Sequence, residues 1–543
     1  MIMGADIMQF LPIYIIFTPV LTALIIYLFK NPWGNRLVFV AQTIMSVLAV
    51  IYFTNYYNNF DATYFVLGNW DDRIGISLFN DEISMIFIFL TLFAWWVVLL
   101  YVYDKKVNYN FLFFLMFLQG VFLGLLQTND LFNMFVFVEL TTIIVTILIA
   151  FKKTGYTFRS AIYYLMLNTS GVLLFLIGIS LIYFTFGTIN IQHVSSNMAL
   201  FEDSIIIRLA FVLMMAGISV KSALFPVFTW LPKAHGAAKS GVSALLSGLI
   251  VKGGLYLFIR ITDMFSGASI NYQPIFFILG ALTGFIGITF AIAQKDIKQM
   301  LAYSTVSQIG LIVMGLSFGE GQVFAGGILH IVNHAIFKMM LFMIAGIIIK
   351  VYLSKEVSQI RGMFKSMPFI SIMMIIAMLA ITGFPFLNGY VSKSVIMYGF
   401  DGSYHYWVVF FMNIGTATLF VKMSQMLLGP SVLSFPISHY RQSITLFILM
   451  LALIGVGNYF VFFEGQFLDV DFSTVNPASL SAFVDFFMTI GFAFILYYYV
   501  IRKDFKPIQY IRGFTLTFEH ANYIFVAYTV VLITVFLIVG VMI

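Results

Sequence analysis

Long apolar runs separated by short polar segments extend along the whole chain. A helix needs about 20 mainly apolar residues to cross the hydrocarbon core of a bilayer. Sixteen runs qualify, at residues 8–29, 36–56, 82–103, 110–128, 131–151, 160–186, 204–226, 240–260, 274–294, 299–318, 322–349, 368–400, 405–428, 442–463, 480–501 and 521–543. The pattern predicts an all-α polytopic membrane protein with about 14–16 transmembrane helices, the first of which is not a cleaved signal.

The segments between these runs are too short for a soluble domain. In the loop at 57–81, the apolar residues Tyr64, Val66, Ile74 and Ile76 occur at alternating positions, which favours a small β-hairpin. Residues 503–519 mix basic and aromatic side chains, which is typical of a segment that lies in the membrane interface.

The composition agrees with a protein that lives in lipid. Of the 543 residues, 62% are hydrophobic and only 9% are charged, so polar side chains are too few to cover a soluble fold. Cysteine is absent, which excludes disulfides, iron–sulfur clusters and thiolate-bound zinc. Any redox chemistry would therefore belong to a partner, and we expect this chain to hold no cofactor.

The net charge of +6 reflects topology rather than nucleic-acid binding. Twenty of the 28 basic residues fall in loops on one side of the predicted bilayer, namely Lys30, Arg36, Lys105, Lys106, Lys152, Lys153, Arg159, Lys233, Lys239, Lys295, Lys298, Lys350, Lys355, Arg361, Lys365, Arg441, Arg502, Lys503, Lys506 and Arg512. The other side holds Arg73, Arg208 and Arg260 with most acids, including Asp71, Asp72, Glu202, Asp203, Glu464, Asp469 and Asp471. By the positive-inside rule both termini face outward, and we expect a protein of the cell membrane, in contact with the lipid bilayer.

Several ionisable residues lie inside predicted spans, where each costs about 2.5–3.5 kcal/mol to insert. They are Lys221, Lys252, Lys338, Lys393, Lys422, Glu139 and Asp485. Lys422 lies about two turns from a helix end and Asp485 one turn, so both also fit a structural role in which the side chain reaches the interface. Glu139 and Lys252 lie too deep for that. Buried charges persist only by pairing, by facing internal water or by losing charge, and these are the conditions of a proton relay.

His330, His334 and Lys338 recur at intervals of four residues, which places them on one face of a helix. Two histidines at this spacing are also typical of a metal site. However, Lys338 on the same face would repel a cation and no carboxylate accompanies the pair, so we expect neither a metal nor a haem. No loop carries paired acids, a nucleophile with its base or a phosphate-binding glycine loop, so no catalytic residue is expected.

Two spans carry a proline close to a lysine, which predicts two broken helices. Pro226 follows Lys221, and Pro385 precedes Lys393. Irregular backbone inside a bilayer is tolerated only along a protein-filled or watery cavity, so both lysines are expected to border one.

The lysines also indicate an internal repeat. Lys221 is followed 31 residues later by Lys252, and Lys393 is followed 29 residues later by Lys422, in each case on the next span. Five helices in each copy would invert the second copy relative to the first. We therefore expect N-terminal helices and an outer hairpin over 1–109, inverted five-helix repeats over 110–262 and 263–430, and further membrane helices over 431–543.

At these residues the chain resembles the antiporter-like subunits shared by respiratory complex I, membrane-bound hydrogenases and Mrp-type cation/proton antiporters. Five blocks occur in the family's order: DLFNMFVFVE at 130–139, KSALFPVFTWLPKAH at 221–235 with GVSALLSGLIVK at 241–252, DIKQMLAYSTVSQ at 296–308, NHAIFK at 333–338, and 383–393. The first block and Lys252 look most like Mrp D-type and hydrogenase-type subunits, whereas 334–338 and 391–393 look more like the largest complex I subunit of this kind. Lys233 stands where the family commonly has an acid.

The resemblance implies a polar axis through the membrane. Glu139 would pair with Lys221 and set its affinity for a proton, and Lys252 would connect the two halves. His334 and Lys338 would continue the path, and Lys393 would be its terminal site. Together with His330, these residues are expected to carry the translocated ions.

Three functions agree with these observations. The first is a non-enzymatic subunit of a multisubunit Na+/H+ antiporter, which translocates protons, with Na+ as the candidate second ion, beside other membrane subunits. The second is the proton-pumping membrane subunit of a redox complex of the NADH–quinone oxidoreductase or hydrogenase type, with all redox sites on partners. The third is the membrane partner of an inorganic carbon uptake system.

Overall fold

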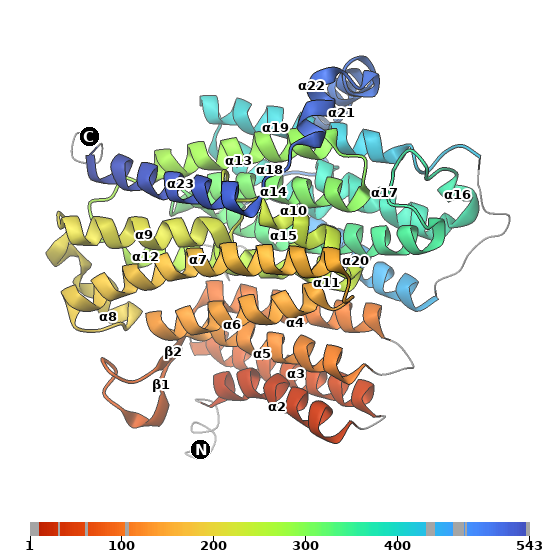
Figure 1. Ribbon diagram of the computed structural model, residues 1–543. Coiled ribbons are helices and arrows are strands. Elements are labelled where there is room, and N and C mark those ends of the chain that lie inside the picture. Colours follow the sequence, from red (N-terminus) through yellow and green to blue (C-terminus); the bar gives the residue numbers. More distant parts are fainter. Residues whose placement is uncertain are drawn as a thin grey trace. The chain divides into compact units, whose positions relative to one another are not determined.

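The computed structural model describes residues 10–30, 33–59, 63–103, 108–430, 440–459, 472 and 475–538. Some predictions fall outside these residues: the span ends at 8–9, 460–463 and 539–543, and the sides assigned to Lys105, Lys106, Glu464, Asp469 and Asp471. The described chain is almost entirely helical (Figure 1). Its contacts divide it into two compact units.

The first unit is assembled from three separate stretches, Met1–Ser222, Val251–Asn271 and Ala521–Ile543. Its elements are α2 (Leu11–Phe29), α3 (Gly34–Asn59), β1 (Thr63–Val66), η1 (Leu67–Asn69), β2 (Ser77–Asn80), α4 (Glu82–Val102), α5 (Tyr109–Gln127), α6 (Leu131–Ala150), α7 (Gly155–Phe186), α8 (Ile191–Asn197), η2 (Met198–Phe201), α9 (Ile205–Lys221), α12 (Val251–Met264) and most of α23 (Phe518–Ile538). Within this unit α2 packs on α3 and α5, and α7 packs on α6 and α9.

The second unit comprises Ala223–Ile250 and Tyr272–His520. Its elements are α10 (Trp230–Ala237), α11 (Ser240–Leu245), the π-helix η3 (Leu246–Ile250), α13 (Gln273–Ala293), α14 (Ile297–Leu316), α15 (Gly321–Tyr352), α16 (Met363–Ser366), α17 (Pro368–Thr382), α18 (Asn388–Gly399), α19 (Tyr404–Ser424), α20 (Tyr440–Asn458), α21 (Leu480–Tyr499), η5 (Ile501–Lys503) and α22 (Lys506–Gly513). Within this unit α15 packs against α11, α14, α17, α18 and α20.

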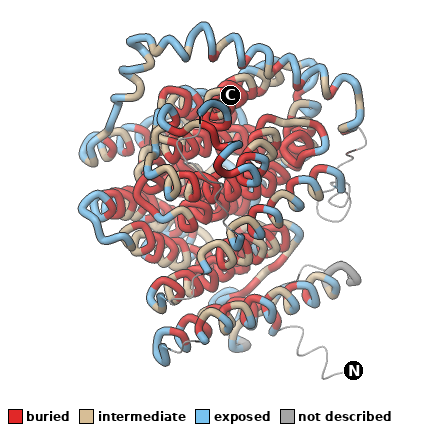
Figure 2. The backbone as a smooth tube through the Cα atoms, turned by 90° about the vertical axis from the view of Figure 1, so that its right-hand side faces the viewer, coloured by how far each residue is buried: buried red, intermediate tan, exposed pale blue. Residues whose placement is uncertain are grey.

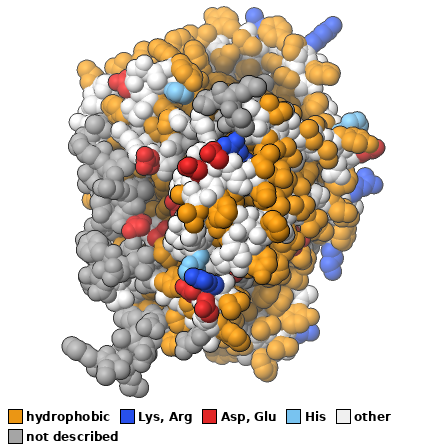
Figure 3. Space-filling model, turned by 90° about the vertical axis from the view of Figure 1, so that its left-hand side faces the viewer, with side chains coloured by type: hydrophobic (Ala, Val, Ile, Leu, Met, Phe, Trp, Pro, Cys, Tyr) orange, Lys and Arg blue, Asp and Glu red, His pale blue; other side chains and the backbone are white. Residues whose placement is uncertain are grey.

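Fourteen helices among the described residues are long and apolar enough to cross a membrane. Each corresponds to one of the sixteen predicted spans, and the two remaining spans are those predicted to be broken. Many of the helices have an exposed face that is largely apolar, as expected for contact with lipid (Figures 2 and 3). The prediction of a polytopic all-α membrane protein is therefore confirmed, whereas the repeat boundaries and the orientation stay predictions.

The predicted hairpin is also confirmed. Strands β1 and β2 pair antiparallel, with Thr63 opposite Asn80 and Val66 opposite Ser77. Asp81 then caps α4, because its carboxylate accepts a hydrogen bond of 2.9 Å from the Ser84 backbone.

Both predicted breaks are present, and the first is a complete interruption of the helix. Helix α9 ends at Lys221, before the end of the predicted span at 226, and helix α10 begins only at Trp230. The ring of Pro226 cannot donate a backbone hydrogen bond, and it also restricts the residue before it, so the helix stops earlier.

The second break separates α17 from α18 and contains Pro385. Gly383 ends α17 with a φ of +89°, a conformation that disfavours other side chains. A Cβ atom built on Gly389 would lie 1.8 Å from the carbonyl oxygen of Ala380. Glycine at this position therefore permits the two half-helices to approach closely.

Candidate functional site

The first unit brings Glu139, Lys221 and two threonines together. The Thr169 hydroxyl on α7 donates a hydrogen bond of 2.8 Å to Oε1 of Glu139, on α6. Lys221, only 4% exposed at the end of α9, donates a hydrogen bond of 2.6 Å to the hydroxyl of Thr142. Thr142 follows Glu139 by nearly one turn, and the Glu139 carboxylate acts electrostatically on Lys221. Each member of the expected acid–lysine pair therefore bonds to a threonine hydroxyl of a neighbouring helix.

Glu139 is less buried than its position far inside the predicted span suggested. Its side chain is half-buried, because α6 has a partly exposed face, but its Oε2 atom is inaccessible to solvent. The ring of Tyr164 lies 5.9 Å from the Lys221 ammonium, close enough for a cation–π interaction. The Lys221 ammonium therefore contacts a threonine hydroxyl and an aromatic ring within the first unit.

Lys252 is fully buried in the first turn of α12, directly after the π-helix η3. π-Helices are rare and often mark functional sites. The chain passes from one unit to the other after Ser222 and again after Ile250, so Lys221 and Lys252 each lie within two residues of such a passage.

Arg260 was predicted to lie in a loop on the outer side of the membrane, but it lies within a helix. It lies in α12, two turns after Lys252, and is 8% exposed. Its guanidinium makes two hydrogen bonds to Asp81, of 2.5 and 2.6 Å, and its Nε donates to the Tyr256 hydroxyl at 2.9 Å. An arginine can be buried at this depth because a carboxylate satisfies its charge.

In the second unit, α15 presents the predicted stripe of His330, His334 and Lys338, all fully buried. The Nε2 atom of His330 lies 3.0 Å from Oε1 of Gln308, and its Nδ1 atom lies 2.8 Å from the Ser392 hydroxyl. An amide oxygen only accepts, so Nε2 carries hydrogen, whereas the hydroxyl donates to a neutral ring or accepts from a charged one. His330 thus keeps both hydrogen bonds in either protonation state.

Lys338 and Lys393 bond to neutral acceptors. The Lys338 ammonium donates to the Ser304 hydroxyl at 2.8 Å and to the Leu301 carbonyl at 3.1 Å. Lys393 on α18 donates at 2.6 Å to the carbonyl of Ile381, in the last turn of α17. The broken helix therefore supplies a backbone acceptor to the terminal lysine, as expected from irregular backbone beside a cavity.

Lys393 lines a pocket of about 240 Å³ within the second unit. Asp485 lines the same pocket, although no motif or spacing in the sequence connects the two residues. Lys422, by contrast, donates to the carbonyls of Ile292 and Gln294 at the end of α13, at 2.7 and 2.6 Å. A cation at a helix C-terminus is stabilising, so the contacts of Lys422 fit a structural role.

The neutral partners of the buried charges are not indicated by the sequence. Thr142, Thr169, Ser304, Gln308 and Ser392 each bond to a predicted site residue. Hydroxyl residues are frequent in membrane helices, where they bond to the preceding turn, so their identity alone carries no signal. Only the spacing of Thr142, three residues after Glu139, could have indicated its role.

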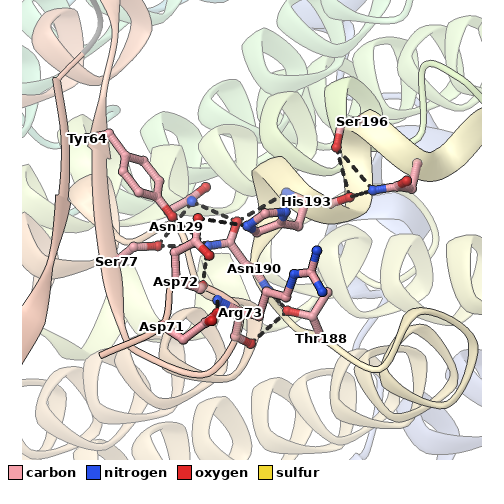
Figure 4. Close-up of polar contacts among 11 residues, drawn as sticks. Tyr64, Asp71, Asp72, Arg73, Ser77, Asn129, Thr188, Asn190, His193 and Ser196 are labelled. Atoms are coloured by element: carbon pink, nitrogen blue, oxygen red, sulfur yellow. Dashed lines mark hydrogen bonds and ion pairs between the residues drawn. The ribbon is translucent and has the colours of Figure 1, made fainter. Parts of the chain in front are cut away.

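A separate polar network holds the hairpin in place (Figure 4). The Asn190 amide donates to the hydroxyl of Tyr64 and to the backbone carbonyl of Asp72, both at 2.9 Å. The Nε2 atom of His193 donates a hydrogen bond of 2.9 Å to the Asp72 carboxylate, and this bond lowers the pKa of Asp72 below its usual value. The network thus connects the hairpin and its turn to the start of α8. None of the predicted site residues belongs to it.

Comparisons with known proteins agree with the resemblance found in the sequence. Residues 128–421 match the model of the family described as NADH:quinone oxidoreductase/Mrp antiporter, TM. The D-type subunit of the Na(+)/H(+) antiporter from Alkalihalophilus pseudofirmus is 30% identical over 392 residues, which cover 70% of this chain and 78% of the relative.

Two solved structures share the fold. A chain of the archaeal membrane-bound sulfane sulfur reductase is 26% identical with a TM-score of 0.77, over 90% of this chain and 99% of that one. A chain of the Mrp complex from Dietzia sp. DQ12-45-1b has a TM-score of 0.73 at 19% identity, over 93% and 100% of the two chains.

Proposed function

Because the chain belongs to the NADH:quinone oxidoreductase/Mrp antiporter family of membrane proteins, we propose that it is an ion-translocating subunit of a multisubunit Na+/H+ antiporter. It acts beside other membrane subunits and carries no enzymatic chemistry of its own. The relative from Alkalihalophilus pseudofirmus, which is itself a subunit of a Na(+)/H(+) antiporter, supports this proposal.

The observation that carries the proposal is the cluster around Lys221. A lysine without water holds its proton weakly, and a nearby carboxylate strengthens that hold. Glu139 acts on Lys221 electrostatically, and Thr142 accepts the hydrogen bond of the ammonium. A shift of α6 against α9 would change the distance between acid and lysine, so Lys221 would alternately bind and release a proton.

The second unit supplies the later steps of the proposed path. His330 exchanges a proton without losing its hydrogen bonds to Gln308 and Ser392. Lys338 and Lys393 are buried, and among the described residues the hydrogen bonds of their ammonium groups go to neutral acceptors. Glu139, Lys221, Lys252, His330, His334, Lys338 and Lys393 are the groups that we assign to translocation.

Proton-coupled Na+ exchange in inverted vesicles from an antiporter-deficient host that expresses the whole gene cluster tests this function. Glu139→Gln and Lys393→Met should each lower exchange by about tenfold or more, with normal amounts of protein in the membrane. Glu202→Gln and Lys350→Met remove an exposed acid and an exposed lysine, and they should leave exchange unchanged. Exchange that survives both site substitutions would refute the assigned path.

A second candidate function rests on the likeness to the sulfane sulfur reductase chain, which is 26% identical over 90% of this chain. In that case the chain would pump ions in a redox complex whose electron carriers belong to partners. The same vesicles separate the candidates, because antiport proceeds on an imposed ion gradient alone. A redox pump moves ions only while an electron donor is oxidised.

A further inference from the structure

The pocket beside Lys393 has a polar wall drawn from four helices, α17, α18, α19 and α21. Lys393 and Ser394 come from α18, Asp401 from the loop that follows, Tyr406 from α19 and Asp485 from α21. A buried lysine and two carboxylates thus face one space of about 240 Å³, which is enough for several water molecules.

Access to solvent changes sharply across this pocket. Lys393 is 3% exposed, and its ammonium is held by the Ile381 carbonyl, whereas Asp485 and Asp401 are both exposed. Tyr406 lies within electrostatic range of both carboxylates. The wall of the pocket therefore combines a buried lysine with two exposed carboxylates.

Asp485 does not belong to the segment that defines the family, because the family match ends at residue 421. It is supplied by α21, which packs on α19 within the same unit. Asp485 lies one turn into α21, near the end that is opposite to the basic residues Arg502 and Lys503. By the distribution of charge, this end and Asp401 face outward.

We propose that this pocket is the outward-facing aqueous chamber of Lys393, and that Asp485 receives the proton which Lys393 releases. The inference rests on the proposed transport function. In this step the Nζ–H bond of Lys393 breaks and an O–H bond forms on Asp485 through intervening water, which leaves a neutral amine and a neutral acid. Asp485 then gives the proton to the outer solution and regains its charge.

The absence of cysteine makes the chamber directly testable, because each introduced cysteine is the only thiol of the chain. Ser394 lines the pocket, whereas Ser392 on the same helix is fully buried and bonds to His330. In vesicles that hold the whole complex, a membrane-impermeant thiosulfonate applied from the face of Asp401 should modify Ser394→Cys and spare Ser392→Cys. Asp401→Cys reports which face the reagent reaches.

The charge of the reagent then reports on Asp485. A carboxylate in the chamber attracts a cationic thiosulfonate and repels an anionic one, so Ser394→Cys should react faster with the cationic reagent. Adding Asp485→Asn should lower that ratio several-fold. Two results would refute the proposed chamber. One is that the reagent fails to modify Ser394→Cys from this face, and the other is that Asp485→Asn leaves the ratio of the cationic to the anionic modification rate unchanged.

The role of Asp485 as proton acceptor is tested by the pH profile of exchange. Asp485→Asn should slow exchange and remove one titrating group from the profile, and Asp485→Glu should restore both. Asp203→Asn, an exposed acid of the first unit, serves as the control and should change neither. An unchanged rate and profile in Asp485→Asn would refute the acceptor role.

The two kinds of experiment separate this inference from the proposed function. Thiol modification requires no transport. If Ser394→Cys reacts as expected in a complex that shows no Na+/H+ exchange, the antiporter function is refuted and the proposed chamber is supported. If exchange depends on Lys393 but Ser394→Cys does not react, the antiporter function is supported and the proposed chamber is refuted.

Discussion

Asn333 of α15 and Asn388, the first residue of α18, each bond to the other's backbone. The Asn333 amide donates to the Asn388 carbonyl at 2.6 Å, and the Asn388 amide donates to the Asn333 carbonyl at 3.3 Å. Both side chains are fully buried. The pair therefore fastens the helix of His330 to the half-helix of Lys393.

We expect Asn333→Ala to lower the free energy of unfolding by about 1 kcal/mol, because a buried interhelical hydrogen bond is lost. Asn388→Ala should cost less, since its bond is longer. Asn333→Asp should cost most, because a carboxylate cannot donate and would face a carbonyl oxygen. Thermal unfolding of the purified protein in detergent gives the order, and equal melting temperatures for all three variants would contradict it.

Gly389→Ala should destabilise the second break. The added methyl group would overlap the Ala380 carbonyl, which lies 1.8 Å from its position, so α17 and α18 must separate. Overpacking of this kind costs about 1–3 kcal/mol. Gly491→Ala is the control, because a Cβ atom there meets nothing within 4 Å and alanine favours a helix. A melting temperature that falls for Gly389→Ala and not for Gly491→Ala is the expected result.

The pair of Asp81 and Arg260 should make stability depend on pH. Burial disfavours a charged Asp81, but the charge and hydrogen bonds of Arg260 outweigh this effect and lower its pKa below the usual value. A lowered pKa stabilises the folded state above the unfolded value of about 3.9, and this contribution disappears as the pH falls through the folded pKa. The melting temperature of the wild type should therefore approach that of Asp81→Asn in acid.

At neutral pH, Asp81→Asn should cost about 3–5 kcal/mol, because Arg260 is left buried without its counter-charge. Asp203→Asn breaks the pair with Arg208, which is 3.1 Å long, but the Asp203 side chain is 82% exposed. A surface pair contributes at most about 1 kcal/mol, so this variant should melt near the wild type. Equal losses in the two variants would show that burial of the pair does not matter.

Lys338→Met and Lys350→Met remove two lysines of the same helix. Lys338 is fully buried and bonds to Ser304, whereas Lys350 is exposed near the end of α15. If the stripe carries protons, Lys338→Met should reduce exchange about a hundredfold and Lys350→Met should not. Exchange measured in vesicles with matched protein content decides between these outcomes.

The fold was largely predictable because a helix that crosses a lipid bilayer requires a long apolar run in the sequence. Apolar runs of about 20 residues predict the spans, and proline near a lysine predicts the breaks around Pro226 and Pro385. The place where α9 ends was not predictable, because the residues between Lys221 and Pro226 are themselves compatible with a helix.

The sequence predicts which helices carry charged or histidine side chains but not which groups these side chains bond to, and their role in translocation stays a prediction. His330, His334 and Lys338 share a helix face, which follows from spacing alone. The pocket that joins Lys393 to Asp485 depends on how α21 packs against α19, and residues so far apart in a sequence leave no local pattern. The hydrogen bonds between Asn333 and Asn388 were not predictable either, because these residues are also far apart in the sequence.

Helix α23 belongs to the first unit although it follows the second unit in the chain. Its Tyr528 donates a hydrogen bond of 2.8 Å to Ser219, two residues before Lys221, and its Phe536 packs on Phe211. During synthesis, the ribosome must therefore deliver every helix of the second unit to the membrane before the surroundings of Lys221 are finished. Until α23 is inserted, Ser219 and Phe211 lack these contacts, so the first unit is completed last.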